Sequence, residues 1–201
     1  MGTASVVGLL VPAFEDGSPA AVAGGTATGA LFLLVTGRLL AKHDVKVGRW
    51  RGAGVRRSVL VFAVLFLHSL PEGMAMGTAY ASEREGLGLF VILAITLQNV
   101  PEGTSVAIPM AGAGFGRAQM FWAAVLTSAP QPLAAPLAYL AVETVTGLLP
   151  FSFAFAAGAM LSLVFTQLIP DAFTRTTWRL ASIGTAAGAT LMLVLSAVLG
   201  V

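Results

Sequence analysis

The sequence predicts an all-α protein that crosses a lipid bilayer several times. Of its 201 residues, 57% are hydrophobic and only 10% are charged, and the mean hydropathy is +0.88. So few polar residues could not coat a water-soluble globule of this size. Apolar stretches of about 20 residues, the length that spans a bilayer core as a helix, follow one another with short loops between them. We therefore expect one polytopic helical membrane domain over residues 1–201, with about six full spans and a short N-terminal helix.

The expected spans are separated by polar turns, and residues 1–14 are apolar but too short to span the bilayer. The fourth span contains three prolines within seven residues, which predicts a broken or strongly kinked helix. Glycines in the first span should let neighbouring helices approach closely. The spans run from about Ala20 to Leu40, Ser58 to Ala81, Leu87 to Ala113, Ala118 to Val145, Phe151 to Ile169 and Leu180 to Val201.

The charged residues indicate which side of the membrane each loop faces. Basic residues concentrate in a loop over residues 42–57, which the positive-inside rule makes cytoplasmic. The alternation of spans then places Arg38, Arg117, Arg175 and Arg179 on the same side and only Arg84 outside. The outer side receives five acidic residues, which would raise the local concentration of cations. These residues are Glu15, Asp16, Glu83, Glu85 and Glu143.

Composition also limits the chemistry. The chain has no cysteine, which excludes disulfides and thiolate metal sites, so a bound metal would use histidine, carboxylate, amide or thioether ligands. The net charge of +2 is too small to indicate a nucleic-acid partner. We expect no organic cofactor.

Two related motifs lie inside the second and third spans. The first is His-Ser-Leu-Pro-Glu-Gly at residues 68–73, and the second is Gln-Asn-Val-Pro-Glu-Gly at residues 98–103. Each proline leaves a backbone carbonyl of the preceding turn without a donor, which is tolerated at membrane depth where the helix lines a cavity. The glycine after each glutamate should permit close helix contact. Because the two spans run in opposite directions, the motifs should lie at similar depth.

The two glutamates indicate which chemistry the motifs can perform. A carboxylate at the centre of a membrane helix costs at least ~2.5 kcal/mol on insertion scales, so it is rarely placed there without a partner. His68 lies one helical turn before Glu72, and Gln98 one turn before Glu102, so each pair shares a helix face. Together they offer one imidazole, two carboxylates and one amide. That set suits a borderline divalent metal such as Zn²⁺, with Fe²⁺, Mn²⁺ or Cd²⁺ as alternatives.

Each residue taken alone has a simpler interpretation. An isolated buried histidine is more often a hydrogen-bonded core residue, and intramembrane polar residues also hold helices together. The repetition of the pattern on adjacent spans favours a metal or ion site instead, because burying both charges without a cation would be costly.

The two motifs resemble the signature of the fourth and fifth transmembrane helices of ZIP metal transporters, most closely the bacterial GufA-type branch. The likeness extends to residues 9–15, 29–34, 156–160 and 167–171, and so over essentially the whole chain. Family members usually have eight spans, whereas this chain begins inside the counterpart of the second. The resemblance therefore implies either a true start upstream of Met1 or a shortened member.

The resemblance implies a plasma-membrane transporter that carries zinc or a related divalent ion into the cytoplasm. His68, Glu72, Gln98 and Glu102 match the ligands of the family's first metal. Three positions of its second metal depart from the pattern: Ser69 stands where Asn is common, Asn99 where Asp is common, and Gln131 where Glu is common. Because acids are replaced by neutral groups, we expect one bound metal where relatives often hold two.

Two other functions compete with transport. A degenerate relative could survive as a non-transporting subunit, and an intramembrane metalloenzyme would need an activated water and a general base. The sequence contains no His-Glu-x-x-His pair to supply them, so we expect no enzyme activity. The expected partners are the divalent metal ion and the lipid bilayer, with a homodimer kept open.

Overall fold

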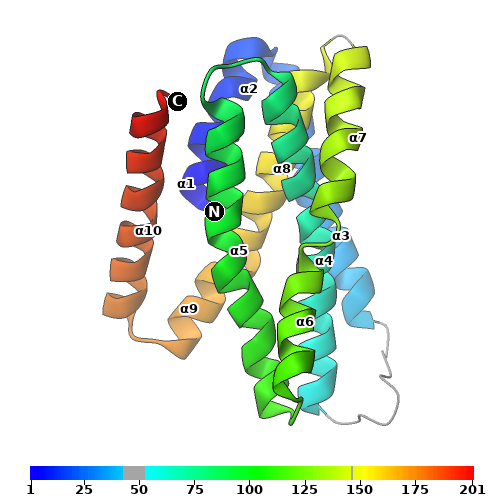
Figure 1. Ribbon diagram of the computed structural model, residues 1–201, viewed down its shortest axis with the longest axis vertical. Helices are drawn as coiled ribbons and strands as arrows, with labels where there is room; N and C mark the ends of the chain where they lie inside the picture. Colours follow the sequence, from blue (N-terminus) through cyan, green and yellow to red (C-terminus); the bar gives the residue numbers. More distant parts are fainter. Residues whose placement is uncertain (43–52, 146) are drawn as a thin grey trace.

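A computed structural model of the protein describes residues 1–42, 53–145 and 147–201, and in these residues every regular element is a helix (Figure 1). The predicted basic loop therefore lies mostly outside the described residues. The elements are α1 (Gly2–Ser5), the π-helix η1 (Val6–Leu10), α2 (Val11–Asp16), α3 (Pro19–Lys42), α4 (Ala53–Ala81), α5 (Leu87–Gly112), α6 (Arg117–Thr127), α7 (Gln131–Thr144), α8 (Leu148–Leu163), the π-helix η2 (Val164–Leu168), α9 (Ile169–Arg175) and α10 (Trp178–Leu199).

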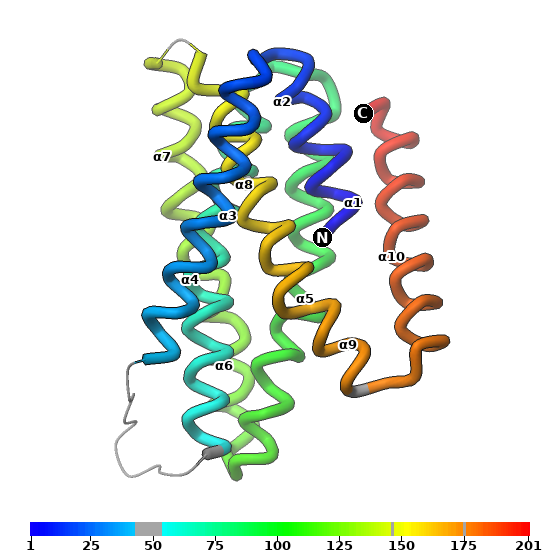
Figure 2. The backbone as a smooth tube through the Cα atoms, turned by 180° about the vertical axis from the view of Figure 1, so that it is seen from behind, coloured from blue at the N-terminus to red at the C-terminus, as the bar shows by residue number. Residues whose placement is uncertain are grey.

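Five segments are long and apolar enough to cross a bilayer, and they match five of the six predicted spans. They are Pro19–Lys42, Gly54–Ala81, Leu87–Gly112, Leu148–Thr174 and Trp178–Leu199. The remaining predicted span is the pair α6 and α7, of 11 and 14 residues, which lie end to end in Figures 1 and 2. The prediction of a broken fourth helix is thus confirmed, and the fold is the expected helical membrane bundle.

The break between α6 and α7 follows from its prolines. Helix α6 closes with tight turns, in which the N–H of Ser128 donates to the Val125 carbonyl and that of Ala129 to the Leu126 carbonyl. Pro130 and Pro132 then occupy the cap and first turn of α7, where a helix leaves its N–H groups without intrahelical partners, so their missing donors cost little. Gln131 consequently becomes the first residue of a helix that starts in mid-bundle.

Glycines let α3 pack directly on α8. A Cβ added at Gly25 would lie 2.7 Å from the Phe151 carbonyl oxygen, and one at Gly29 would overlap the Phe155 carbonyl. Gly158 meets the backbone of Thr26 from the opposite side in the same way. The predicted close approach is confirmed for Gly25 and Gly29, and this backbone contact ties α3 and α8 into one pair.

Two apolar clusters fill the bundle on either side of the motif level. The first contains Ala75 and Ala79, which follow the motif of α4, and buries Phe90 and Phe153 completely. The second contains Leu65, which precedes that motif, together with Val106 and Leu163 from α5 and α8. The polar motif residues therefore lie between two layers of apolar side chains.

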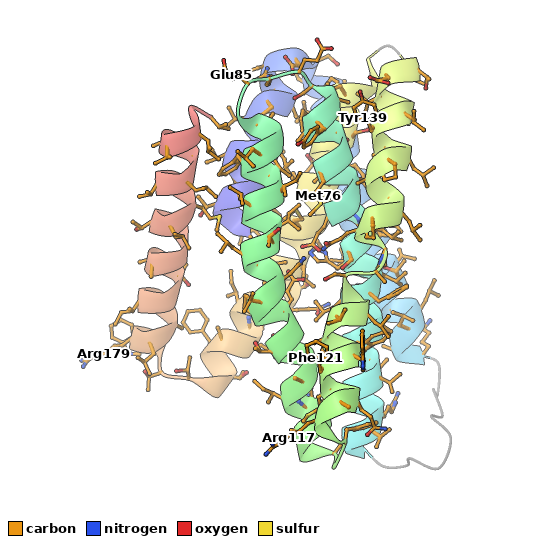
Figure 3. All side chains as sticks on the ribbon, in the orientation of Figure 1. Met76, Glu85, Arg117, Phe121, Tyr139 and Arg179 are labelled. Atoms are coloured by element: carbon orange, nitrogen blue, oxygen red, sulfur yellow. The ribbon has the colours of Figure 1, made fainter. Side chains whose placement is uncertain are left out.

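The two ends of the bundle carry opposite charge, as the sequence predicted. One end, here called the acidic end, is formed where α2 meets α3, α4 meets α5 and α7 meets α8, and it carries Glu15, Asp16, Glu83, Glu85 and Glu143. The other, the basic end, carries Lys42, Arg56, Arg57, Arg117 and Arg179, with Asp171 as an acidic residue among them. Figure 3 shows Glu85 at the first end and Arg117 and Arg179 at the second.

Arg84 is the basic residue of the acidic end, and it joins two of its connections. Its guanidinium nitrogens lie 2.5 Å from Glu15 Oε2 and 2.6 Å from Asp16 Oδ1. The hydrogen bonds that Arg84 donates to Asp16 first, and then to Glu15, raise the pKa of its guanidinium group. The α4–α5 turn is therefore held to the end of α2, although an exposed ion pair of this kind contributes no more than ~1 kcal/mol.

The α3–α8 contact makes a testable prediction. We expect Gly29→Ala to lower the free energy of unfolding by about 1–3 kcal/mol, because the added methyl group must push α3 away from the Phe155 backbone. Gly37→Ala is the matched control in the same helix, since nothing lies within 4 Å of its added Cβ. Thermal unfolding in detergent measures both variants. Equal midpoints for the two would show that the backbone contact does not determine stability.

Candidate metal centre

Three helices bring all seven predicted site residues together between the apolar layers. Six of them are 0–7% exposed, and Asn99 is half-buried. A hydrogen bond from Gln98 on α5 to Glu72 on α4 places the two motifs at one depth, as the antiparallel arrangement predicted. The residues are His68, Ser69 and Glu72 on α4, Gln98, Asn99 and Glu102 on α5, and Gln131 at the start of α7.

A histidine and two carboxylates form the centre of this cluster. His68, Glu72 and Glu102 each offer one ligand atom, and these atoms all lie within 4.8 Å of one another. The spacing of four residues on α4 places His68 Nε2 3.6 Å from Glu72 Oε1. Ligands about 2.1 Å from a tetrahedral zinc ion lie about 3.4 Å apart, so small side-chain movements would bring the three atoms around one ion.

Several polar atoms of the cluster are buried with no hydrogen-bond partner among the described residues. They include both ring nitrogens of His68, Oε1 of Gln98 and Oε1 of Glu102. A buried polar atom without a partner costs ~1–3 kcal/mol, so native proteins rarely leave several together. Imidazole nitrogen, amide oxygen and carboxylate oxygen are all groups that a borderline divalent cation accepts as ligands. The donor set and its unpaired atoms therefore fit a metal ion as cargo.

The charge of the centre favours a cation for the same reason. Glu72 is fully buried and Glu102 is 6% exposed, and both lie inside helices that are long and apolar enough to cross a bilayer. Two carboxylates this close repel each other when ionised, and that repulsion is screened poorly away from water. A divalent cation between them would neutralise both charges.

Amide groups surround Glu72 on its other side. Gln98 Nε2 donates to Glu72 Oε1 at 3.3 Å, and Gln131 Nε2 donates to Glu72 Oε2 at 2.7 Å. Gln131 and Asn99 also exchange two hydrogen bonds of 3.1 Å, each amide donating to the other's oxygen. Both oxygens of Glu72 are thus held, whereas His68 and Glu102 keep unpaired atoms.

The comparison with known proteins decides the family. A family model described as "ZIP Zinc transporter" matches residues 26–196. The chain belongs to the ZIP zinc transporter family. The zinc transporter GufA of Myxococcus xanthus is 36% identical over 203 aligned residues, which cover 96% of this chain and 80% of that protein. The zinc transporter ZIP11 of Homo sapiens is 35% identical over 155 residues, or 74% of this chain and 45% of its own length.

Membership of the ZIP family confirms the resemblance on which the sequence analysis relied. A candidate zinc transporter of Arabidopsis thaliana is 37% identical over 162 residues, but these make up only 26% of that longer protein. The chain thus spans most of the bacterial relative and less than half of the plant and human ones. The relatives are named as zinc transporters rather than enzymes.

The glycines of the two ZIP motifs contact the two halves of the broken helix. A Cβ added at Gly73 would lie 2.6 Å from the carbonyl oxygen of Gln131, so only glycine lets α7 begin this close to α4. A Cβ added at Gly103 would lie 3.2 Å from the Cβ of Ala124 on α6, a contact that small shifts can relieve. The predicted close packing after each glutamate is confirmed, and it is tighter at Gly73.

Sequence reasoning missed two buried hydroxyl groups. The Oγ1 atom of Thr78 and the Oγ atom of Ser162 are buried without a hydrogen-bond partner among the described residues. Thr78 lies six residues after Glu72, about 9 Å further toward the acidic end. Nothing in the sequence separates them from Thr28, Thr36 and Thr96, whose hydroxyls simply bond to their own helices.

Proposed function

We propose that this protein moves a divalent metal ion, with zinc as the first choice, across the plasma membrane into the cytoplasm. The ion would bind at the intramembrane cluster of His68, Glu72, Gln98 and Glu102. One observation carries the proposal: three buried ligand groups meet between apolar layers, and several of their atoms have no hydrogen-bond partner in the part of the chain that the structure describes. The zinc transporters to which the chain is similar support the choice of metal.

The cluster has the chemistry that exchange of a hydration shell requires. An ion entering the bundle loses water ligands, and direct bonds to two carboxylates, an imidazole and an amide oxygen would replace them. The carboxylates neutralise the charge of the ion at a depth where an unpaired charge is costly. Alkali ions, which carry a single charge and prefer oxygen ligands alone, match this set poorly.

The charge of the two ends supports uptake rather than export. The acidic end would gather cations from outside, and the positive-inside rule assigns the basic end, with the loop over residues 42–57, to the cytoplasm. The apolar cluster around Phe90 and Phe153 lies between the acidic end and the metal cluster, so it must open for an ion to pass. A rocking or sliding of one helix group against another would open it, as alternating access requires.

The neutral residues beside the centre support a single metal. Ser69, Asn99 and Gln131 add no charge next to Glu72 and Glu102, whose combined charge of two matches one divalent ion. A second ion in the same small volume would lack carboxylates of its own. A homodimer remains part of the hypothesis, with each chain holding a complete cluster.

Zinc uptake into proteoliposomes tests the transport function. We expect His68→Ala and Glu102→Gln to slow the uptake of radioactive zinc at least about ten-fold at low zinc concentration, because each removes a ligand worth more than about 1.4 kcal/mol. His43→Ala is the matched control, since His43 is the other histidine of the chain. Equal rates in all four proteins would contradict the proposal and favour a non-transporting relative.

Calorimetric titration tests the number of ions. We expect zinc to bind the detergent-solubilised wild-type chain at one tight site, and His68→Ala to lose that site, because only two carboxylates are available to neutralise metal charge. Two tight zinc ions per chain in the wild type would contradict the single-metal arrangement while leaving transport intact.

A further inference from the structure

The pair formed by Asn99 and Gln131 has a bonding pattern that a metal ligand would not need. The two side chains come from different helices, α5 and α7, and donate to each other reciprocally at 3.1 Å. Both residues stand at positions where the sequence analysis expected metal ligands. In the structure they bind each other instead, and Gln131 also donates to Glu72.

The hydrogen-bonding capacity of Gln131 is almost fully used. Its amide group has two hydrogens, and one goes to Asn99 Oδ1 while the other goes to Glu72 Oε2 at 2.7 Å. Its oxygen accepts from Asn99 Nδ2. The opposite amide orientation would set oxygen against the carboxylate of Glu72, two acceptors with no proton between them. Glu72 therefore determines how Gln131 points, and Gln131 determines how Asn99 points.

This chain of hydrogen bonds restrains Glu72 on the side away from His68. Gln131 holds Oε2, and the longer bond from Gln98 holds Oε1. Both bonds are strengthened by the charge of the ionised carboxylate. Gln131 is the stronger of the two restraints because its bond is 2.7 Å long and that of Gln98 is 3.3 Å long. The two N–H groups of Gln131 donate to Asn99 and Glu72, and its oxygen accepts from Asn99, so these bonds fix the direction of the amide.

The backbone keeps Gln131 in this place. Pro130 starts α7 at this level, and Gly73 allows the backbone of Gln131 to lie directly on α4. Neither Asn99 nor Gln131 adds charge, so their bonds orient Glu72 without changing the charge that the ion meets. This lack of charge distinguishes the pair from the two carboxylates, Glu72 and Glu102.

We propose that Gln131 is a positioning residue for the metal site: it fixes the Glu72 carboxylate for binding, and Asn99 acts only through Gln131. This inference rests on the proposed metal site but assigns its two outer amides a role distinct from ligation. Asn99 supports the amide of Gln131, and Glu72 alone of the three contacts the ion.

A double-mutant cycle on the full chain in detergent, with zinc as the probe, tests this role. We expect Gln131→Met, which keeps the length of the side chain but cannot donate, to raise the zinc Kd by about 10- to 100-fold, the loss of a hydrogen bond to a charged group. Asn99→Ala should raise it less. The double variant should match Gln131→Met within about three-fold, because Asn99 has no effect of its own once Gln131 is gone.

The number of sites separates positioning from damage to the fold. A misfolded fraction would lower the number of zinc ions bound per chain, whereas a displaced Glu72 raises the Kd at an unchanged number of one. Gln119→Met is the matched control, because its amide caps α6 at an exposed position with a 2.9 Å bond from the Gly116 N–H. It should leave the zinc Kd unchanged.

Three results would overturn the inference. If Gln131→Met bound zinc with wild-type affinity, the amide of Gln131 would not position Glu72. If Asn99→Ala bound zinc with wild-type affinity, Asn99 would not support the amide of Gln131. Effects that multiply in the double variant would make Asn99 an independent contributor. In each of these cases the wild-type chain still binds zinc and the proposed function stands, whereas a wild-type chain that binds none removes both.

Discussion

The structure depends on the burial of two carboxylates at the depth of the bilayer core. Glu72 and Glu102 cannot be hydrated there, and each would cost ~2.5 kcal/mol or more if it stood alone. The surrounding elements are arranged to make that burial tolerable: His68 lies on the same face of α4, amides reach Glu72 from α5 and α7, and Gly73 lets α7 come close to α4. What remains unsatisfied after this arrangement is the set of atoms that a cation can satisfy.

Most of the fold could be predicted from sequence because membrane helices are determined by length and hydropathy. Proline density at 130–136 even located the broken span, since proline costs little at a helix start, whereas within a helix it removes a hydrogen bond. His68, Glu72, Gln98 and Glu102 followed from spacing alone. Ser69, Asn99 and Gln131 came only from family resemblance, because residues on separate helices carry no local pattern. That Gln131 bonds to both Asn99 and Glu72 depends on the orientation of α7, which no sequence pattern encodes.

The two motifs are less equivalent in space than in sequence. Gly73 and Gly77 fix α7 against α4 through backbone contacts that tolerate no side chain, whereas Gly103 meets α6 only through the Cβ of Ala124. The half of the broken helix that carries Gln131 is therefore the half more tightly held. Of the two glutamates, the one beside that half has both oxygens hydrogen-bonded, and the other keeps an unpaired oxygen. Helix packing thus decides which carboxylate is restrained.

This asymmetry suits a site that must both bind and release. If every ligand were fully hydrogen-bonded in the empty protein, an arriving ion would have to break those bonds and would bind weakly. If no ligand were hydrogen-bonded in the empty protein, the empty site would be unstable. Release would then be slow, because the departing ion would leave every ligand group unpaired. The observed site lies between these limits. Glu72 is held in place, whereas atoms of His68, Gln98 and Glu102 have no hydrogen-bond partner among the described residues. The fixed carboxylate gives the ion a defined first contact, and the unpaired atoms supply the further bonds that hold it at the midpoint of the membrane.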